Sequence, residues 1–364
     1  MSQSKMKTIA VTGSQGFICG YLCKELLSNG YRVIGYDNYS KYGRVARAHD
    51  NHPNFKLVEF DLAKSTPDFE YFAPDYIILG AALIGGIATF HKYAFDLIMQ
   101  NELIMANSYK SILNMDYVPE RVVTISSSMV FEGADIEADK LSDIYDKDML
   151  DRVCNNIIWP THESYVKTFP PPQSTYGAQK LMTEYWARGA WEQYKIPYTI
   201  VRPFNCVGLG ELASTFDAKV MSGNVKLLMS HVLPDLVHKC LSGQKPLRVL
   251  GDGNQIRCYT HGKDIARGIR LAMESPAGIN NDYNISTPRA TTVKELAELV
   301  WKEVHGTLDE FALESDEPFF YDVQKRVPYV GKAEDQLGFK AEVSLEESVS
   351  ELVNHMRKDY ASLK

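Results

Sequence analysis

The chain has 364 residues, of which 45% are hydrophobic and 23% are charged, and its formal net charge is -7. This composition is typical of a folded protein with a large core and excludes disorder as the main state. A negative balance without a long basic run offers no electrostatic site for nucleic acid or for an anionic membrane surface. The longest apolar stretch, from Tyr76 to Ile87, is too short for a membrane span, so we expect a cytoplasmic protein with a small-molecule partner.

The six cysteines are scattered along the chain, without a Cys-x-x-Cys pair and without a pair of histidines beside them. Such spacing argues against a zinc site and against a disulfide framework. We therefore expect reduced thiols and no bound metal.

The first predicted element is a short apolar run in the segment Lys7 to Thr12, which is followed by Gly13 and Gly16 and then by an amphipathic stretch that ends at Asn29-Gly30. This order predicts a strand, a tight turn and a helix. The glycines have no side chain to keep a pyrophosphate away from the backbone N–H groups and from the positive end of the helix dipole. The turn therefore predicts a bound dinucleotide.

A second apolar run, Arg32 to Tyr36, ends at Asp37, about 20 residues past the glycines, where dinucleotide-binding folds carry an acidic residue. Asp37 can accept hydrogen bonds from both ribose hydroxyls, and its charge repels a 2′-phosphate. The position favours NAD as the cofactor. Lys41 and Arg44 lie close in sequence and keep NADP open as the alternative.

Three more apolar runs follow, and each ends in polar or small residues. They are Phe55–Phe60 before Asp61, Tyr76–Leu79 before Gly80-Ala81-Ala82, and Arg121–Ile125 before Ser126, with a helical stretch from Phe95 to Leu113 ahead of the last run. Strands that alternate with helices predict an α/β fold with a doubly wound parallel (Rossmann) sheet, whose ligands bind beyond the carboxyl ends of the strands.

Beyond about residue 200 the predicted elements become shorter, because Pro203, Pro234 and Pro246 interrupt them. We expect a smaller C-terminal substrate-binding domain. The predicted NAD-binding domain covers residues 1–203, has an insertion at about 133–169 and is rejoined by about 251–275, whereas residues 204–364 mainly form the substrate domain.

Three groups of residues point to catalysis: Ser126-Ser127-Ser128 at a strand end, Tyr176 with Lys180, and the run from Arg202 to Asn205. Tyr176 and Lys180 are four residues apart, so a helix places the phenol and the ammonium on one face. Together with the glycine turn, these motifs resemble the extended short-chain dehydrogenase/reductase family, in particular its NAD-dependent nucleotide-sugar epimerases, dehydratases and reductases. Further matches are Asn101, Gly251 to Asp264, Tyr283-Asn284-Ile285, and Asp322 to Phe339.

The resemblance implies an enzyme in which Tyr176 takes a proton from a sugar hydroxyl, Lys180 tunes the pKa of the phenol, and Ser127 orients the hydroxyl. Ser128 is the alternative to Ser127. The implied cofactor contacts are Gly13, Gln15, Gly16, Phe17, Ile18, Asp37, Asn38, Asp61, Leu62, Ala81, Ala82, Asn101, Tyr176, Lys180 and Pro203. The implied substrate contacts are Ser128, Met129, Asn205, Arg257 and Arg326, of which the two arginines grip a diphosphate because guanidinium forks match phosphate oxygens.

The two residues after Ser127 limit the choice among the reactions of the family. Ser128 and Met129 stand where the 4,6-dehydratases of the family carry Asp-Glu, and where enzymes that invert carbons 3 and 5 carry a cysteine at the second position. Neither residue can act as a carboxylic acid, so a dehydratase is disfavoured. We expect a nucleotide-sugar epimerase that inverts C4 through a transient 4-keto sugar, with the hydride held on bound NAD.

Other readings stay open. A nucleotide-sugar 4-dehydrogenase or 4-ketoreductase would use the same residues, and a non-catalytic NAD-binding sensor is the alternative from another class. The segment Gly80 to Ile87 with Asp96 to Asn101 is similar to GDP-sugar enzymes, so we expect a GDP- or UDP-linked substrate. The resemblance also implies a homodimer formed through the helices that start near Phe95 and Tyr176.

Two features depart from the family pattern. Cys19 stands where the third glycine of the turn is expected, and the glycine is displaced to Gly20. The segment between Ser127 and Tyr176 is also longer than in relatives, because of the residues from about 133 to 169. They include Asp143, Tyr145, Asp146, Asp148, Trp159, His162 and Tyr165. We expect either a lid over the sugar or a surface loop, and His162 is either an additional acid/base or a solvated side chain.

Overall fold

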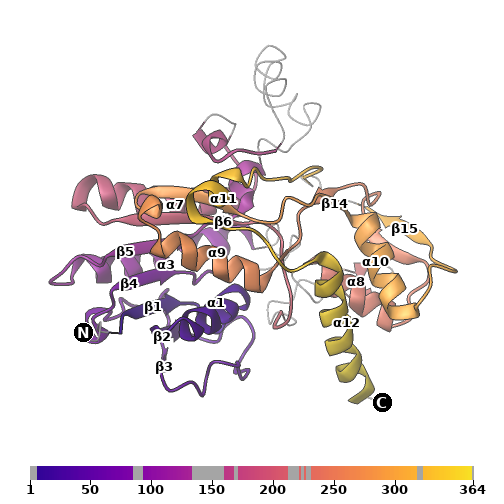
Figure 1. Cartoon of the computed structure of the whole chain (residues 1–364), viewed down its shortest axis with the longest axis horizontal. Coiled ribbons are helices and arrows are strands. Elements are labelled where there is room, and N and C mark those ends of the chain that lie inside the picture. The colour runs from indigo at the N-terminus through magenta and orange to yellow at the C-terminus, as the bar shows by residue number, and fades with distance from the viewer. Residues whose placement is uncertain are drawn as a thin grey trace, which may run out of the picture.

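The computed structural model describes residues 6–84, 93–132, 160–167, 171–211, 221–222, 225–226, 231–317 and 323–362. Seven parallel strands form its central sheet in the order β3-β2-β1-β4-β5-β6-β13 (Figure 1). These strands are β1 (Thr8–Thr12), β2 (Arg32–Asp37), β3 (Phe55–Glu59), β4 (Tyr76–Leu79), β5 (Arg121–Ile125), β6 (Tyr198–Pro203) and β13 (Asn281–Ile285). The predicted doubly wound Rossmann sheet is confirmed.

The strand order reverses at β1, which has β2 on one side and β4 on the other. In open α/β sheets this switch point is where the loops after the strands part and leave a crevice for a ligand. The glycine turn after β1 and Asp37 at the end of β2 therefore lie at the edge of the sheet where a dinucleotide binds.

Helices cover both faces of the sheet. The helices among the described residues are α1 (Phe17–Ser28), α3 (Ala94–Leu113), α7 (Thr175–Tyr194), α8 (Val232–Leu241), α9 (Gly262–Glu274), α10 (Val293–His305), α11 (Gly331–Leu337) and α12 (Leu345–Ser362), with short 3-10 helices η1 (Glu70–Phe72), η2 (Ser128–Phe131), η3 (Glu163–Lys167) and η4 (Pro276–Gly278). Of these, α1, α9 and α11 pack on one face of the sheet, and α3 and α7 pack on the other.

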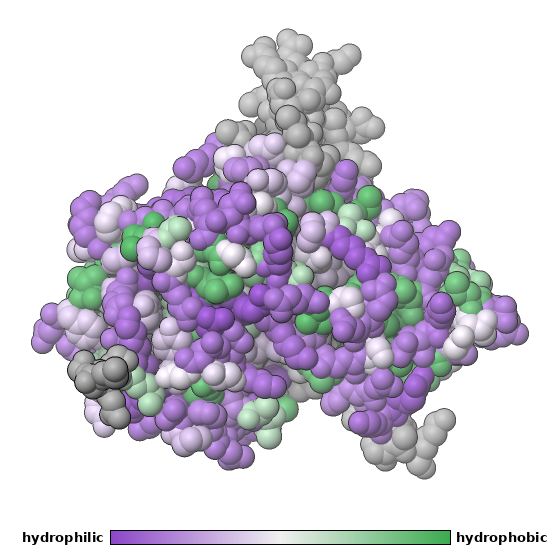
Figure 2. All heavy atoms as spheres, in the orientation of Figure 1, coloured by the Kyte–Doolittle hydropathy of each residue, from purple (hydrophilic) through white to green (hydrophobic). Residues whose placement is uncertain are grey.

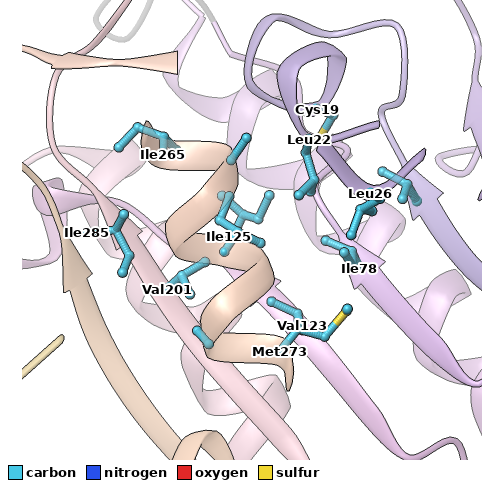
Figure 3. Packing of buried hydrophobic residues seen from close by; sticks show 14 of the residues in the cluster. Cys19, Leu22, Leu26, Ile78, Val123, Ile125, Val201, Ile265, Met273 and Ile285 are labelled. Carbon is cyan, nitrogen blue, oxygen red and sulfur yellow. The ribbon is translucent and has the colours of Figure 1, made fainter. Parts of the chain in front are cut away.

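The alternation of side chains along each strand explains the two layers. Ile9 and Val11 of β1 face the cluster that includes α1 and α9, whereas Ala10 between them faces the cluster that includes α3. Successive strand residues point to opposite faces, so a run of apolar residues is buried on both sides. Figure 3 shows the first cluster, in which Leu22 of α1 and Met273 of α9 pack with residues of β4, β5, β6 and β13.

A smaller lobe follows at the other end of the molecule (Figure 1), where α8, α10 and α12 share a separate apolar cluster. Its short strands pair in twos, β10 (Leu247–Leu250) with β15 (Leu313–Asp316) and β11 (Ile256–Arg257) with β14 (Thr291–Thr292). The strands β7 (Cys206–Val207) and β12 (Thr260–His261) also pair, as do β8 (Met221–Ser222) and β9 (Val225–Lys226). The chain leaves the sheet after β6 and returns to it with α9 and β13.

Within the described ranges, none of the helices combines the length and the apolar character that crossing a bilayer needs. The same ranges contain no group of three or more His, Cys, Asp or Glu side chains that could hold a metal ion. The five cysteines among them are buried and form no disulfide, and Cys154 lies outside the described residues.

Candidate active site

The glycine turn is tightly packed between the ends of three strands. Gly13 has a φ of 73°, and its N–H donates to the carbonyl of Tyr36 at 2.7 Å. A Cβ atom on Gly13 would lie 2.8 Å from Cα of Ala81, and one on Gly16 would lie 2.9 Å from the carbonyl oxygen of Gly13. Both positions need glycine for steric reasons, since real Cβ atoms do not approach backbone so closely.

Asp37 is held rigidly beside this turn. Its Oδ2 accepts the N–H of Gln15 at 2.9 Å, and its Oδ1 accepts the N–H of Tyr39 at 2.7 Å. Burial raises the pKa of the carboxyl group, and these backbone N–H donors oppose the rise. Each carboxylate oxygen has capacity for a further hydrogen bond, so the residues here fit the adenosine ribose of a dinucleotide.

The cations that keep NADP open are engaged elsewhere. The Arg44 guanidinium donates to both carboxylate oxygens of Glu59, at 2.7 and 2.5 Å, and the Lys41 ammonium lies 4.9 Å from the centroid of the Tyr42 ring. Each cation therefore has a partner other than Asp37. This arrangement agrees with the preference for NAD.

Replacing Asp37 by Ser should reduce the preference for NAD. The loss of a charged acceptor for ribose hydroxyls should weaken NAD binding by about 10- to 100-fold, while the loss of charge repulsion should make NADP binding stronger. Calorimetric titration with both dinucleotides measures the ratio of the dissociation constants for NAD and NADP. Asp116→Ser, at an exposed carboxylate after α3, is the control, and an unchanged ratio in the Asp37 variant would show that another residue selects the cofactor.

Cys19, at the position of the missing glycine, packs against the sheet. Its Sγ lies 3.6 Å from the carbonyl oxygen of Thr12, and a Cβ atom on Gly80 would come within 2.4 Å of this sulfur. Gly80 at the end of β4 thus leaves the space that the thiol occupies, whereas a Cβ atom on Gly20 would meet nothing within 4 Å. Burial raises the pKa of Cys19 to about 12, so the thiol is a neutral packing group.

The loop after β4 is pinned by polar side chains. The N–H groups of Gly80 and Ala81 donate to Oγ1 of Thr12 at 3.0 Å each, and Asn101 of α3 exchanges two hydrogen bonds with the backbone of Leu83. The amide of Asn101 therefore positions this loop. Ala82 lies within the pinned loop, between Ala81 and Leu83.

The loop after β3 is stabilised by Asp61. Its Oδ1 accepts the N–H of Ala63 at 3.1 Å, its Oδ2 pairs with Lys64 at 3.1 Å, and the next residue, Leu62, is buried. These contacts hold the backbone where the cofactor is predicted to lie. That Asp61 or Leu62 contacts the cofactor itself stays a prediction.

Ser127, Tyr176 and Lys180 converge at the carboxyl end of β5. Ser127 precedes η2, and its Oγ accepts the N–H of Met129 at 3.2 Å. Tyr176 lies in the first turn of α7, and a hydrogen bond from Ser127 reaches its phenol. The Lys180 ammonium donates to the carbonyl of Ile125 at 3.2 Å and lies 6.0 Å from the centroid of the Tyr176 ring. The structure brings together the three residues predicted to be catalytic; their roles stay a prediction.

Burial dominates the electrostatics of this trio. Burial raises the pKa of Tyr176 to about 12, opposed by the hydrogen bond with Ser127 and by the positive charge of Arg326. Burial lowers the pKa of Lys180 to about 8, opposed by Cys19. Lys180 is thus close to the phenol, but the groups of this chain that favour the phenolate are Ser127 and Arg326.

The start of α7 is fixed by two side-chain contacts. Oγ of Ser174 accepts the N–H of Gly177 at 3.0 Å, which satisfies a free donor of the first helical turn. The buried carboxylate of Glu132 accepts the N–H of Ser174 at 2.7 Å, beside the positive end of the helix dipole. These contacts set the direction in which Tyr176 leaves the helix.

Asn205 follows β6 in a left-handed conformation, with a φ of 33°. Its carbonyl accepts the N–H of Thr260 at 3.1 Å, while its buried Nδ2 has no hydrogen-bond partner among the described residues. A buried donor without a partner is costly unless something satisfies it. Asn205 therefore fits the predicted role of a ligand contact.

The two arginines predicted to grip a diphosphate differ in their surroundings. Arg326 is buried, and its charge reaches Tyr176. The Arg257 guanidinium donates to the carbonyls of Ile256 at 2.9 Å and Val323 at 2.5 Å, so it holds main chain near Arg326. Arg257 thus supports the loop that carries the other arginine, and a direct contact with substrate stays a prediction.

A buried charge network lies behind the trio, and the sequence interpretation missed it. Glu184 follows Tyr176 and Lys180 at the same spacing of four on α7. Its carboxylate accepts a hydrogen bond from Oγ of Ser126 at 2.8 Å. It also accepts hydrogen bonds from Nε and Nη2 of Arg202, at 2.7 and 2.8 Å. The spacing of four residues could have indicated Glu184 in the sequence, because it places Glu184 on the helix face that carries the catalytic candidates.

The long segment between Ser127 and Tyr176 is described only in part. Asp143, Tyr145, Asp146, Asp148 and Trp159 lie outside the described residues, whereas His162 and Tyr165 lie within them. The ring of His162 stacks on that of Tyr329 at a centroid distance of 5.0 Å. His162 thus packs against an aromatic side chain, and the lid stays a prediction.

Comparisons with known proteins extend over most of the chain. The NAD dependent epimerase/dehydratase family matches residues 9–286. UDP-glucuronic acid decarboxylase 1 of Xenopus tropicalis is 23% identical over 363 residues, which are 99% of this chain and 74% of that protein. A Putative UDP-glucose 4-epimerase of Methanocaldococcus jannaschii is 26% identical over 353 residues, which are 96% of this chain and 99% of that protein.

Solved structures share the fold. UDP-glucose 4-epimerase of Thermotoga maritima, solved with UDP-glucose, matches with a TM-score of 0.70 and 25% identity, covering 97% of this chain and 99% of that one. UDP-N-acetylglucosamine 4-epimerase from Methanobrevibacter ruminantium matches with a TM-score of 0.76 and 24% identity, covering 98% and 99%.

Proposed function

This chain belongs to the NAD dependent epimerase/dehydratase family, and from that premise we propose that it is a nucleotide-sugar epimerase that inverts C4. The predicted family and its NAD cofactor are confirmed by this membership. The observation that carries the proposed reaction is the convergence of Tyr176, Ser127 and Lys180 beyond the end of β5. A proton acceptor, a hydroxyl that orients the substrate and a cation are the groups that a protein can contribute to the oxidation of a carbinol by bound NAD.

In the proposed mechanism, bound NAD supplies the acceptor and later the donor of a hydride. Tyr176 takes the proton of the C4 hydroxyl and returns it after the keto-sugar has presented its other face. Ser127 orients that hydroxyl by a hydrogen bond, and the Lys180 ammonium, 6.0 Å from the centroid of the Tyr176 ring, adds a more distant positive charge. Arg326 stabilises the phenolate and faces the anionic part of the substrate.

The residues of the strand end favour reaction at one carbon. Ser128 and Met129 provide no carboxylic acid beside Ser127, so this chain lacks the pair that would eliminate water from C5 and C6. Decarboxylation is the second candidate, because relatives are named UDP-glucuronic acid decarboxylases. Oxidation of a uronic acid at C4 places a ketone β to the carboxylate, and such an acid loses carbon dioxide without a further catalytic acid.

The nucleotide is proposed to be UDP. The T. maritima enzyme was solved with UDP-glucose, and the M. ruminantium enzyme with UDP-N-acetylmuramic acid. A GDP-linked sugar is the alternative from the sequence motifs. A diphosphate is common to both, so Arg326 serves either one.

The test is incubation of the purified protein with UDP-glucose, UDP-N-acetylglucosamine, UDP-glucuronic acid and GDP-mannose, without added cofactor, followed by proton NMR of the products. Interconversion of two 4-epimers supports the proposal. Net formation of NADH or of a stable keto-sugar would assign a 4-dehydrogenase or 4-ketoreductase, and release of carbon dioxide would assign a decarboxylase. A protein that binds NAD but converts none of the sugars would favour the sensor.

We propose in addition that the protein forms a homodimer through α3 and α7. Phe95, Met99 and Leu103 lie four residues apart along α3 and are exposed, as are Met182 and Tyr185 of the adjacent α7. Together they form an apolar stripe on the outer surface of the helix pair. On the opposite side of the sheet, Figure 2 shows a surface over α9 and α11 in which hydrophilic residues predominate. Apolar stripes of this kind mark interfaces.

Replacing Phe95 by Glu should convert the protein to a monomer. Phe95 is 73% exposed in the single chain, and a carboxylate in the centre of an apolar interface should weaken association by at least about 100-fold. Light scattering coupled to size-exclusion chromatography measures the mass. The control is Tyr71→Glu, since Tyr71 is 74% exposed but lies outside α3 and α7; a monomeric unmodified protein would contradict the proposal.

A further inference from the structure

The segment that carries Arg326, residues 323–330 and here called the Arg326 strap, runs between two anchors. The first anchor is β11. The N–H of Ile256 donates to the carbonyl of Gln324 at 2.8 Å, and the N–H of Arg326 donates to the carbonyl of Ile256 at 3.0 Å. The Arg257 side chain adds its bond to the carbonyl of Val323. These contacts hold the strap ahead of Arg326.

The second anchor, residues 161–163, is here called the clamp and lies within the long segment between the catalytic serine and tyrosine. The N–H of Thr161 donates to the carbonyl of Val327, and the N–H of Tyr329 donates to the carbonyl of Thr161, both at 2.8 Å. Thr161 and Pro328 thereby form a short parallel bridge, and His162 stacks on Tyr329. The clamp holds the strap directly after Arg326.

Glu163 fixes the clamp to the central sheet. Its side chain is buried, and its Oε1 accepts the N–H of Asn284 in β13 at 3.0 Å. The Asn284 amide in turn donates to the carbonyls of Thr161 at 3.1 Å and Tyr329 at 3.3 Å. One carboxylate therefore ties the edge strand, the clamp and the strap into a single junction.

We propose that Glu163 is a positioning residue, which holds the Arg326 strap so that the guanidinium faces Tyr176 and the anionic part of the substrate. The reference to substrate rests on the proposed function. Arg326 lies two residues from the bridge at Pro328, so a loosened clamp would let the arginine move away from the phenol. This role goes beyond a lid, because it links the long segment to the chemistry through main-chain hydrogen bonds.

The charges around Tyr176 and Glu163 decide whether replacing Glu163 raises or lowers the pKa of Tyr176. The phenol of Tyr176 is faced by Ser127, which follows β5, and by Arg326 from the strap, and the Lys180 ammonium of its own helix lies 6.0 Å from the ring centroid. Glu163 is faced by the N–H of Asn284 and by the charges of Lys332 and His162. Withdrawal of Arg326 would raise the pKa of Tyr176, whereas loss of the Glu163 negative charge by itself would lower it.

The test compares Glu163→Ala with Glu163→Gln, whose amide oxygen can still accept the N–H of Asn284. Glu163→Ala should raise KM for the nucleotide sugar about tenfold and move the acid limb of kcat/KM up by roughly one pH unit, while Glu163→Gln stays close to the unmodified enzyme. Asp75→Ala is the matched control. It removes a carboxylate that accepts a backbone N–H, that of Thr8 at 2.7 Å, at the opposite end of the sheet, and it should change neither quantity.

Hydrogen exchange provides a readout that does not depend on activity. In Glu163→Ala, the amides of Arg326 and Tyr329 should exchange at least about tenfold faster than in the unmodified protein and in Asp75→Ala. Unchanged exchange would overturn the inference even for an inactive protein, and so would faster exchange with KM and pH profile equal to those of Asp75→Ala. Absence of any sugar conversion by the unmodified protein would instead contradict the proposed function alone.

Discussion

Replacing Tyr176 by Phe should abolish turnover and leave NAD bound. The variant keeps the ring, which is buried at the start of α7, but loses the oxygen that Ser127 and Arg326 favour as a phenolate. General-base catalysis contributes about 100- to 10,000-fold, so kcat should fall by a factor in this range. The measurement is the rate of 4-epimer formation, together with a calorimetric titration of NAD.

Tyr194→Phe is the matched control for this variant. Tyr194 lies on the same helix but is 49% exposed at its far end, so its hydroxyl has no part in the site and the rate should be unchanged. A Tyr176→Phe protein with full activity would show that the base lies elsewhere. Loss of NAD binding in the variant would show instead that the phenol is mainly a cofactor contact.

Replacing Glu184 by Ala should have the largest effect on stability. Glu184 and Arg202 are fully buried, and the guanidinium also donates to Asp282 at 2.7 Å. Removing one partner leaves Arg202 buried with less compensating charge, which costs about 3–5 kcal/mol in similar networks. Urea unfolding followed by circular dichroism measures the free energy of unfolding.

The control is Glu192→Ala, because Glu192 lies near the exposed end of the same helix. Its replacement should change the free energy of unfolding by less than about 0.5 kcal/mol. The network also joins Ser126 to α7, so a folded Glu184→Ala protein should form the 4-epimer more slowly and should also be less stable. A variant as stable as the control would mean that Arg202 finds other partners.

Local signals were sufficient to predict the glycine turn after β1 and the place of Asp37 beside it. Gly13 and Asp37 were predicted from a strand, a turn and a second strand, and the structure shows a steric reason for the first and two backbone donors for the second. The pairing of Tyr176 with Lys180 also followed from helical spacing alone. These features depend on neighbours in sequence, which is why a pattern predicts them.

Contacts between distant segments could not be predicted. The place of Cys19 depends on Gly80, which makes room for the sulfur from another strand. Arg257 and Arg326 look equivalent in the sequence, yet one supports main chain and the other reaches the phenol. Such differences arise from packing between elements, and a single sequence carries no direct record of them.

By itself the sequence determined the alternation of strands and helices, the glycine turn after β1 and the face of α7 that carries Tyr176 and Lys180, because periodicity and backbone sterics act over a few residues. Only the tertiary structure decided which charges surround the phenol. Burial raises the pKa of Tyr176 against the influence of Ser127 and Arg326, and the depth of burial and the approach of the Arg326 strap are properties of the whole fold.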